Sequence, residues 1–293
     1  MSLINRIKNY WNLHPAGENE VLSLQSDRLA FFDERDRQTK LLYPNLDNDY
    51  DFAKSNGKVT LELGCGMGYN AQRIAQNGAS LVVVDMAERA INLTKERFNL
   101  RNLNADFVVA NCECLPFSSE VIEIVYSSGV IHHTSDTEQA AREIMRVLKS
   151  NGWASIMVYN RNSRWFWWNI VVVLGFLMFF INIVPKSLQR RIIKFNIAWK
   201  DFILDDHERL SFDNVLRAGT DFGGLRNPVS RVYTRRSVKR LFSEMVDFSY
   251  ITQFNQYKAM IMEPSFVVRL IRELLSKIDR KWGWFLIMHA RKK

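Results

Sequence analysis

The sequence has few cysteines and few prolines. Its three cysteines, Cys65, Cys112 and Cys114, are too few and too scattered for a disulfide framework, which favours a protein of a reducing compartment. One residue separates Cys112 from Cys114 and there is no second pair of cysteines, so the sequence predicts no metal site. With only six prolines, and without repeats or low-complexity tracts, the chain is typical of a globular protein rather than a fibrous or disordered one.

The N-terminal segment lacks a continuous apolar stretch. Residues 1–17 include basic side chains but no apolar core of the kind found in secretory signals. We therefore expect a cytoplasmic protein, and residues 165–204, described below, add peripheral attachment to a membrane to that expectation.

Negative charge is scarce in the second half of the chain. Residues 1–160 carry 16 lysines and arginines against 20 acidic residues, a net charge of −4, whereas residues 161–293 carry 24 against 11, a net charge of +13. Positive charge concentrated in this way is typical of contact with a polyanion, either a nucleic acid or an anionic membrane surface.

The first half alternates between short apolar runs and segments of helical periodicity. The runs that predict strands are residues 58–64, 80–85, 105–111, 122–129 and 153–160, and the segments that predict helices are 69–78, 86–98 and 137–152. Two further strands are expected at 248–254 and 282–290. This alternation favours an α/β fold with a seven-stranded, mostly parallel sheet and helices on both faces.

Three glycines follow the first predicted strand at alternate positions. In "LELGCGMG", residues 61–68, Gly64, Gly66 and Gly68 fall at the carboxyl edge of the sheet, where a missing Cβ lets a ligand approach the backbone. Asp85 ends the second strand, 21 residues after Gly64, and a carboxylate in this position accepts both hydroxyls of a ribose. Together these features predict a nucleotide site rather than a plain strand-to-helix turn.

The spacing and the charge around the glycines distinguish between nucleotides. A dinucleotide fingerprint needs its third glycine at the position occupied here by Tyr69. In addition, Glu62 lies two residues before Gly64, and its negative charge would repel a bound pyrophosphate. A cationic ligand is attracted by the same carboxylate. S-adenosylmethionine carries a sulfonium and an ammonium group and no phosphate, so it fits the pattern better.

With these motifs in order, the sequence resembles the class I S-adenosylmethionine-dependent methyltransferases, in particular the small-molecule branch that includes the quinone-biosynthesis enzymes. The segments that carry the resemblance are "LELGCGMG", "VVVD", "NCECLPF", "VYSSGVIHHTSDTEQAAREIMRVLKSNG" and "VYNR". They cover about residues 55–160. The resemblance implies a Rossmann-like sheet, S-adenosylmethionine as the cofactor and methyl transfer as the reaction, and it leaves the methyl acceptor open.

The resemblance also implies which residues hold the cofactor. Glu62, together with the glycine turn that contains Cys65, would surround its methionine part. Asp85 would accept the ribose hydroxyls and Met86 would lie against the adenine. Ser128, after the fourth strand, would present its backbone carbonyl to the ammonium group.

The third-strand motif departs from that of the relatives. Relatives commonly have an aspartate that holds the adenine amine, whereas this chain has Asn111, followed by Cys112 and Glu113. Asparagine still offers a carbonyl acceptor to the amine, so the three residues remain candidate adenine contacts. At the N-terminus, Tyr10 or Trp11 would fold over the cofactor pocket as in relatives, or would only anchor the first helix.

Two histidines, His132 and His133, follow the fourth strand at the mouth of the expected pocket. Methyl transfer needs the nucleophile, the methyl group and the leaving sulfur in line, and a hydroxyl acceptor must also lose its proton. Histidine suits this base role, so both are candidate catalytic residues. Alternatively, they shape the loop or hold the cofactor, a role for which His133 is the candidate, and proximity alone drives the reaction.

Residues 165–184, "WFWWNIVVVLGFLMFFINIV", contain no charged side chain. Their length would suffice to cross a bilayer, but the strands that follow must return to the same sheet, which excludes a single crossing. Residues 188–202 repeat apolar side chains at spacings of four and three beside basic ones, which predicts a basic amphipathic helix. We interpret residues 165–204 as an element that lies on an anionic membrane surface, as a lid over a hydrophobic substrate, or as a homodimer interface. The first two interpretations are compatible.

The chain divides into four parts by these patterns. They are an N-terminal helical lid (1–54), a cofactor-binding core (55–160), an apolar and basic α-helical insertion between strands five and six (161–230), and a segment that completes the sheet (231–293). In the last part, Arg231 and Tyr233 are candidate substrate contacts.

The sequence thus predicts methyl transfer to an oxygen or carbon of a hydrophobic small molecule near a membrane. Three alternatives stay open: an RNA methyltransferase that uses the basic half, a methyltransferase of sugars or other natural products, and a non-catalytic cofactor-binding subunit. No RNA-binding module is recognisable, so a nucleic acid is not the expected partner.

Overall fold

The computed structural model describes residues 1–18, 21–185, 211–220, 227–253 and 281–293. These residues form an eight-stranded sheet in the order β3-β2-β1-β4-β5-β8-β7, with β6 paired to β5. The strands are β1 (Val59–Leu63), β2 (Ser80–Asp85), β3 (Asp106–Val109), β4 (Ile122–Ser128), β5 (Leu148–Asn160), β6 (Val232–Tyr233), β7 (Met245–Gln253) and β8 (Phe285–Lys292). β8 runs antiparallel to β5 and β7, and the other pairs are parallel. The predicted Rossmann-like fold is confirmed, with β6 as an additional short strand.

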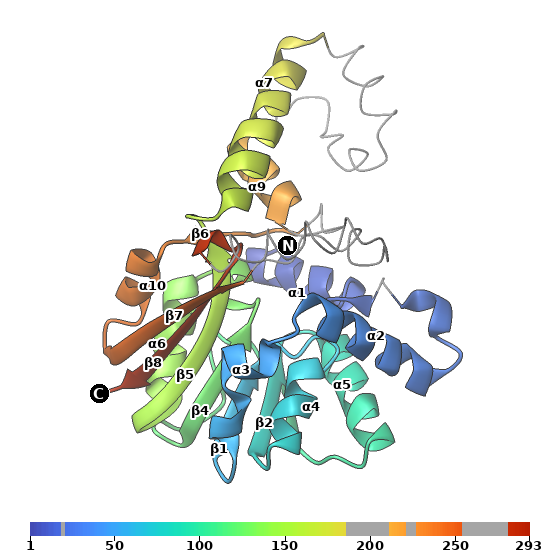
Figure 1. Ribbon diagram of the computed structural model, residues 1–293, viewed down its shortest axis with the longest axis vertical. Helices are drawn as coiled ribbons and strands as arrows, with labels where there is room; N and C mark the ends of the chain where they lie inside the picture. Colours follow the sequence, from blue (N-terminus) through green and yellow to red (C-terminus); the bar gives the residue numbers. More distant parts are fainter. Residues whose placement is uncertain (19–20, 186–210, 221–226, 254–280) are drawn as a thin grey trace.

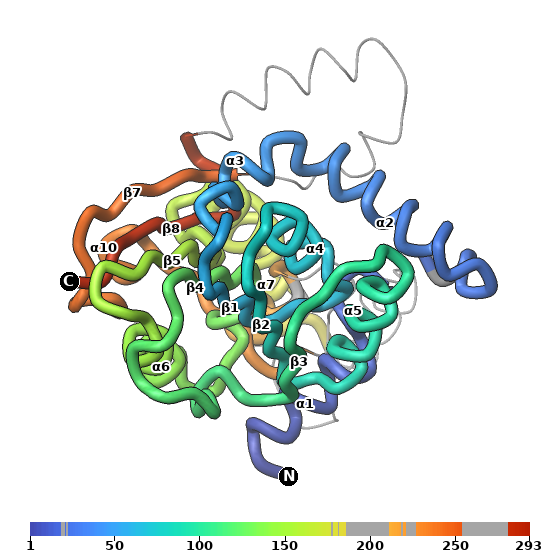
Figure 2. Tube along the Cα trace, turned by 90° about the horizontal axis from the view of Figure 1, so that it is seen from below, coloured from blue at the N-terminus to red at the C-terminus, as the bar shows by residue number. Residues whose placement is uncertain are grey.

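Helices cover both faces of this sheet (Figure 2). One face packs against α3 (Leu46–Tyr50), α4 (Tyr69–Gln76) and α5 (Glu88–Leu100), and the other packs against α6 (Thr137–Val147) and α10 (Arg235–Leu241). Burial on both faces explains why the central strands have continuous apolar sequences rather than an alternation of apolar and polar residues.

The last predicted helix of the core ends earlier than expected. Within the segment 137–152 the helix was expected to run up to the glycine that follows its end, but α6 ends at Val147 and β5 begins at Leu148. Leu148 is fully buried and pairs with Ile122 of β4, so its side chain is buried by the sheet rather than by a further helical turn. Asn151, at a left-handed φ of 64°, lies in the irregular start of this strand, where the register with β4 shifts.

Two N-terminal helices lie at the carboxyl edge of the sheet. α1 (Leu3–Leu13) crosses above the strand ends and α2 (Arg28–Leu42) lies beside α5 (Figure 1). The Asp27 side chain caps α2 by accepting a hydrogen bond from Ala30 N at 3.0 Å. A buried ion pair between Arg97 of α5 and Asp36 of α2 joins this region to the core.

The insertion after β5 begins as one long apolar helix. A π-helical stretch, Trp165–Leu174, continues into α7 (Gly175–Ile183), and we name residues 165–183 the apolar arm. Figure 1 shows the arm projecting from the carboxyl edge of the sheet, with α9 (Phe212–Thr220) at its base. In the part of the chain that the structure describes, no helix combines the length and apolar character needed to cross a membrane. The amphipathic helix predicted at 188–202 lies outside the described residues.

Candidate active site

A cavity of about 330 Å³ opens at the carboxyl edge of the sheet, beside α1. Eight of the residues predicted from the sequence line it: Gly64, Cys65, Gly66, Asp85, Met86, Cys112, Ser128 and His133. Six others lie outside its lining: Tyr10, Glu62, Gly68, Asn111, Glu113 and His132. The fold therefore brings residues from four predicted motifs into one cavity, as expected where parallel strands end side by side.

The glycine turn after β1 adopts a conformation that requires glycine. Gly64, Gly66 and Gly68 have φ angles of 75°, 52° and 77°. A Cβ at Gly64 would lie 2.1 Å from Cγ2 of Val130, whereas the nearest atom to a Cβ at Gly66 would be Cβ of Ala16 at 3.7 Å. Close packing against Val130 therefore requires glycine at position 64, whereas Gly66 exposes its backbone to the cavity.

Asp85 ends β2 directly beside this turn. Its carboxylate accepts hydrogen bonds from Ala87 N at 2.8 Å and from Gly66 N at 3.4 Å. Burial raises the pKa of Asp85 above its usual value, while these backbone N–H groups lower it. The side chain is therefore held in place at the cavity wall, at the position from which a carboxylate accepts ribose hydroxyls.

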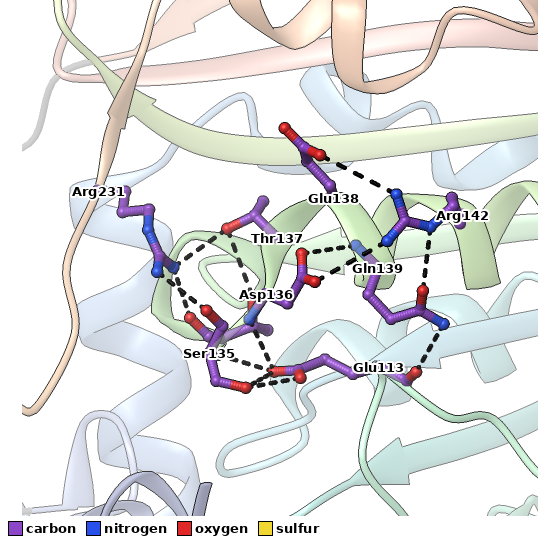
Figure 3. Close-up of polar contacts among 9 residues, drawn as sticks. Glu113, Ser135, Asp136, Thr137, Glu138, Gln139, Arg142 and Arg231 are labelled. Atoms are coloured by element: carbon purple, nitrogen blue, oxygen red, sulfur yellow. Dashed lines mark hydrogen bonds and ion pairs between the residues drawn. The ribbon is translucent and has the colours of Figure 1, made fainter. Parts of the chain in front are cut away.

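The third-strand residues separate into different roles. Cys112 lines the cavity, and burial raises the pKa of its thiol to about 12. Asn111 Oδ1 accepts a hydrogen bond from Glu113 N at 3.0 Å. The Glu113 carboxylate accepts hydrogen bonds from the backbone N and the hydroxyl of Ser135, both at 2.7 Å (Figure 3). Glu113 thus holds the turn that precedes α6, and only Cys112 of the three is part of the cavity wall.

The two histidines occupy one helical turn but differ in access to the cavity. His133 lines it, and its Nδ1 lies 2.8 Å from the carbonyl oxygen of Val229 and 2.9 Å from Nδ2 of Asn227. His132 is fully buried, with its ring 4.1 Å from that of Tyr159, and neither ring nitrogen has a hydrogen-bond partner among the described residues. Burial lowers the pKa of His132 well below its usual value, so this imidazole is neutral.

The candidate substrate contacts in the C-terminal part lie outside the cavity lining. The Arg231 guanidinium donates hydrogen bonds to the carbonyl oxygens of Thr134 at 2.5 Å and Ser135 at 3.0 Å (Figure 3). Its backbone N donates to the carbonyl oxygen of His132 at 3.1 Å. Tyr233, in β6, is half-buried outside the lining. Arg231 therefore fastens the histidine loop to the chain that leads into β6.

Comparison with known proteins agrees with this geometry. Residues 61–156 match the family described as the methyltransferase domain. The chain is 25% identical over 131 residues to a ubiquinone biosynthesis O-methyltransferase of Coxiella burnetii, a match that covers 45% of this chain and 54% of the relative. The match therefore spans about half the length of that relative. Identity to the ubiquinone biosynthesis O-methyltransferase of Bartonella quintana is 28% over 228 residues, which covers 77% of this chain and 85% of the relative.

Two solved structures share the fold. An S-adenosylmethionine-dependent methyltransferase of Thermotoga maritima is 14% identical with a TM-score of 0.50, over 98% of this chain and all of that one. Geranyl diphosphate C-methyltransferase of Streptomyces coelicolor is 12% identical with a TM-score of 0.51, over 85% of this chain and 76% of that one. The chain contains a class I S-adenosylmethionine-dependent methyltransferase domain. The family and the cofactor predicted from the motifs are confirmed.

The site of this methyltransferase domain fits S-adenosylmethionine. Glu62, at the end of β1, is buried, and its Oε2 has no hydrogen-bond partner in the described part of the chain. Burial, together with the charge of Asp85, raises the pKa of Glu62 to about 8. A buried carboxylate without a cation is costly, and a sulfonium and an ammonium group at the nearby glycine turn would offset that cost. Glu62 would act on the cofactor through its charge, and Gly66 and Asp85 by direct contact.

Replacing Asp85 with alanine should weaken the binding of S-adenosylmethionine by about 1–3 kcal/mol, because charge-assisted hydrogen bonds to the ribose are lost. Isothermal titration calorimetry measures the effect. Asp106→Ala is the matched control, since Asp106 is an exposed aspartate at the first residue of β3, away from the carboxyl edge. Equal affinities of Asp85→Ala and the wild-type protein would show that Asp85 does not hold the ribose.

Cofactor binding should release a proton near neutral pH. Without cofactor Glu62 holds its proton up to a pKa of about 8, and an adjacent cation favours the carboxylate and lowers that pKa. The affinity for S-adenosylmethionine should therefore rise from about pH 6 to about pH 8, where the pKa of Glu62 in the cofactor-free protein lies. Calorimetry in buffers of different ionisation enthalpy counts the proton, and Glu62→Gln should abolish its release.

The same shift affects the stability of the cofactor-free protein. The folded state keeps the Glu62 proton up to a pKa of about 8, whereas the unfolded chain loses it near the usual value of 4.5. Stability should therefore fall as the pH rises from about 4.5 to about 8 and then level off, and Glu62→Gln should remove this contribution. Both predictions depend on a protonated Glu62. If the wild-type protein bound cofactor without releasing a proton, Glu62 would already be ionised in the cofactor-free protein.

Sequence reasoning missed the aromatic half of the cavity. Its walls include Tyr43, Tyr50, Met157, Tyr159 and Phe285, contributed by the N-terminal helices, β5 and β8. The Tyr50 hydroxyl lies 2.6 Å from the hydroxyl of Ser128, so an N-terminal residue contacts the end of β4. No local motif marks these residues, because they meet only when distant segments pack together.

Of the two neighbouring aromatic residues in α1, Tyr10 and Trp11, only one lines the cavity. Trp11 lines the cavity, with its ring 5.3 Å from that of His133. Tyr10 is buried outside the lining, with its ring 5.0 Å from that of Trp11. Of these two residues, Trp11 is the one that lines the cavity.

Proposed function

We propose that this protein transfers the methyl group of S-adenosylmethionine to an oxygen or carbon atom of a hydrophobic small molecule. The observation that carries the proposal is the continuity of one cavity. The glycine turn and Asp85 line it, and Tyr43, Tyr159 and Phe285 line the same cavity. A methyl donor and an apolar acceptor can therefore lie in contact within it.

The chemistry of the lining supports an uncharged, apolar acceptor. Apart from His133, the only described lining residues with an ionisable acidic or basic side chain of the Asp, Glu, Lys or Arg type are Asp85 and Arg35. The ring of Phe285 lies 6.0 Å from both Tyr43 and Tyr159, so three aromatic side chains form a contiguous wall. A polynucleotide would need several cations for its phosphates, which this lining does not supply.

The residues of the chain perform the steps that methyl transfer requires. Bound S-adenosylmethionine supplies a methyl group activated by its sulfonium. The glycine turn and Asp85 fix the donor, and the aromatic wall orients the acceptor and excludes water. His133, which lines the same cavity as these two groups of residues, is the proposed base for a hydroxyl acceptor. His132 contacts His133 from outside the lining and is not assigned this role.

Two of the similar proteins have names that agree with a small-molecule acceptor. The Bartonella relative is a ubiquinone biosynthesis O-methyltransferase, and the Streptomyces structure is a geranyl diphosphate C-methyltransferase. Both names support a small acceptor molecule, and they support oxygen and carbon equally as the accepting atom.

Incubation with methyl-labelled S-adenosylmethionine tests the proposal. The purified protein is offered a solvent extract of lipids and metabolites in one reaction and total RNA in another. Label should enter compounds that partition into the organic phase, and mass spectrometry then identifies them. Label confined to RNA, or to sugars in the aqueous phase, would favour those alternatives. Cofactor binding by calorimetry without transfer to either pool would indicate a non-catalytic subunit.

A further inference from the structure

The apolar arm exposes an unbroken apolar stripe. Eight of its side chains are 45% to 65% exposed: Trp167, Trp168, Val172, Val173, Phe176, Phe179, Phe180 and Ile183. Five of them, Trp168, Val172, Phe176, Phe179 and Ile183, recur at spacings of four and three, so they share one face along the length of the helix. Exposed apolar surface of this extent is rare on a protein without a partner and marks an interaction site.

The opposite face of the arm is already occupied. Phe166 and Ile170 are buried in a cluster with Val215 and Leu216 of α9 and with Trp284. The arm therefore has two apolar faces. The inner face packs on the protein, and this packing keeps the outer stripe directed away from it. Because the arm projects from the body of the protein (Figure 1), its outer face is accessible to a large flat partner.

The charge around the arm identifies the chemistry of that partner. No acidic residue occurs between Glu143 and Asp201, while that interval contains nine lysines and arginines. Two of them, Arg161 and Arg164, directly precede the arm, and residues 186–200 follow it with five cations. A second copy of this chain would bring the same unbalanced cations together around the joined arms, whereas an anionic lipid surface complements them.

Tryptophan, phenylalanine and basic residues together fit a bilayer surface. Trp167 and Trp168 are amphipathic rings of the kind enriched at the headgroup level, and Phe176, Phe179 and Ile183 offer only hydrocarbon to a partner. A helix with one exposed apolar face and flanking cations lies in the interface plane, with that face at the boundary between headgroups and acyl chains.

The base of the arm packs against residues of the cavity wall. Tyr159 and Phe285 line the cavity and pack in the same cluster as Phe166 and Ile170. Trp284 stacks on Tyr159 with ring centroids 4.6 Å apart and joins the two regions. The base of the arm is therefore joined to the aromatic part of the cavity wall.

We propose that the outer face of the apolar arm docks on an anionic bilayer, and that the methyl acceptor is a molecule dissolved in that bilayer. The second clause rests on the proposed function, and the first stands without it. The acceptor then passes from the lipid to the aromatic wall along the base of the arm, without crossing water.

Flotation with lipid vesicles tests the docking. The wild-type protein should float with vesicles that contain phosphatidylglycerol and far less with pure phosphatidylcholine vesicles. The triple variant Phe176→Ser, Phe179→Ser, Phe180→Ser should bind at least about tenfold more weakly, since three exposed apolar anchors are lost. Arg161→Gln should reduce binding to the anionic vesicles by up to about fivefold.

The matched control is the triple variant Leu29→Ser, Leu41→Ser, Leu100→Ser. It removes side chains that are 41% to 49% exposed on α2 and α5, away from the arm, and should float like the wild-type protein. Equal S-adenosylmethionine affinity in all variants, measured by calorimetry, shows that the cofactor site is intact.

Three results would overturn the docking. The first is a wild-type protein that stays in solution with both vesicle types. The second is a wild-type dimer in solution that the phenylalanine variant disrupts and the leucine control leaves intact. The third is equal flotation of the phenylalanine variant and the wild-type protein. Vesicle binding without methyl transfer to any extract would contradict the proposed function and leave the docking in place. The rate of methyl transfer to an organic-phase acceptor could also be the same with and without vesicles, and the same for the phenylalanine variant. That result would contradict only the proposal that the acceptor comes from the membrane.

Discussion

Replacing Arg97 with methionine should lower the free energy of unfolding by about 3–5 kcal/mol, because it removes the fully buried partner of Asp36 and leaves that carboxylate with Arg101 alone, at 3.2 Å. The Arg97 side chain is fully buried, and its Nη1 lies 2.6 Å from Oδ1 of Asp36 and 2.9 Å from Oε1 of Gln72. Its Nε donates a hydrogen bond to the carbonyl oxygen of Met67 at 2.7 Å. One guanidinium therefore joins α5, α2, α4 and the glycine turn.

Urea denaturation followed by circular dichroism measures this effect. The double variant Arg97→Met, Asp36→Leu removes both charges of the pair and should recover much of the lost stability, since Arg101, the other partner of Asp36, keeps its ion pair with Asp33 at 2.6 Å. Arg142→Met is the matched control, because Arg142 and Glu138 are exposed at a separation of 4.0 Å. Removing such a surface pair should change stability by less than about 1 kcal/mol. A similarly small loss for Arg97→Met would mean that the ion pair does not hold the N-terminal helices to the core.

The role of Arg97 also shows where sequence reasoning fails. The helix that contains it was predicted, but nothing within that segment distinguishes Arg97 from the exposed Arg89. Its partner Asp36 lies 61 residues earlier in the chain. A buried charge is recognisable only together with its partner, and that partner is supplied by tertiary packing.

The glycine turn and Asp85 were predictable for the opposite reason. The positive φ angles of Gly64, Gly66 and Gly68 are local backbone requirements that few other residues meet. The position of Asp85 follows from the parallel pairing of β1 with β2, which the apolar runs already indicate. Local backbone chemistry and strand order thus determine the cofactor end of the site.

The aromatic end and the third-strand residues depend on packing instead. Tyr43, Tyr159 and Phe285 come from three distant parts of the chain, so no spacing in the sequence relates them. Glu113 was a candidate cofactor contact because of its place in a motif, yet its carboxylate holds the Ser135 turn. A motif fixes the path of the backbone more firmly than the direction of each side chain.

The apolar sequence of residues 165–184 left three interpretations open, and packing explains why. Helical periodicity does not separate an inner from an outer face when both faces are apolar. The structure distinguishes the two faces of the helix, because Ile170 packs against α9 while Phe176 is exposed. The partner of the exposed face is then a question of charge and accessibility rather than of periodicity.

Replacing His133 with glutamine should lower kcat by about 10²–10⁴-fold for a hydroxyl acceptor, because an amide cannot take up the acceptor proton. Nδ1 of His133 lies 2.8 Å from the carbonyl oxygen of Val229, which can only accept a hydrogen bond, and 2.9 Å from Nδ2 of Asn227, which can only donate one. The base role requires the tautomer in which Nδ1 carries the ring proton and donates it to Val229. This tautomer puts the basic lone pair on Nε2. The orientation of the ring is thus set by a backbone group on the segment that Arg231 ties to the histidine loop.

The measurement separates a base from a residue that only shapes the pocket. For a lost base, kcat falls while the affinity for S-adenosylmethionine, measured by calorimetry, stays within about twofold of the wild-type value. For a lost pocket wall, KM for the acceptor rises and kcat changes little. His14→Gln is the matched control, since His14 is exposed and outside the cavity lining. An unchanged kcat for His133→Gln would assign the reaction to proximity and alignment, and the aromatic wall and the glycine turn would then account for catalysis.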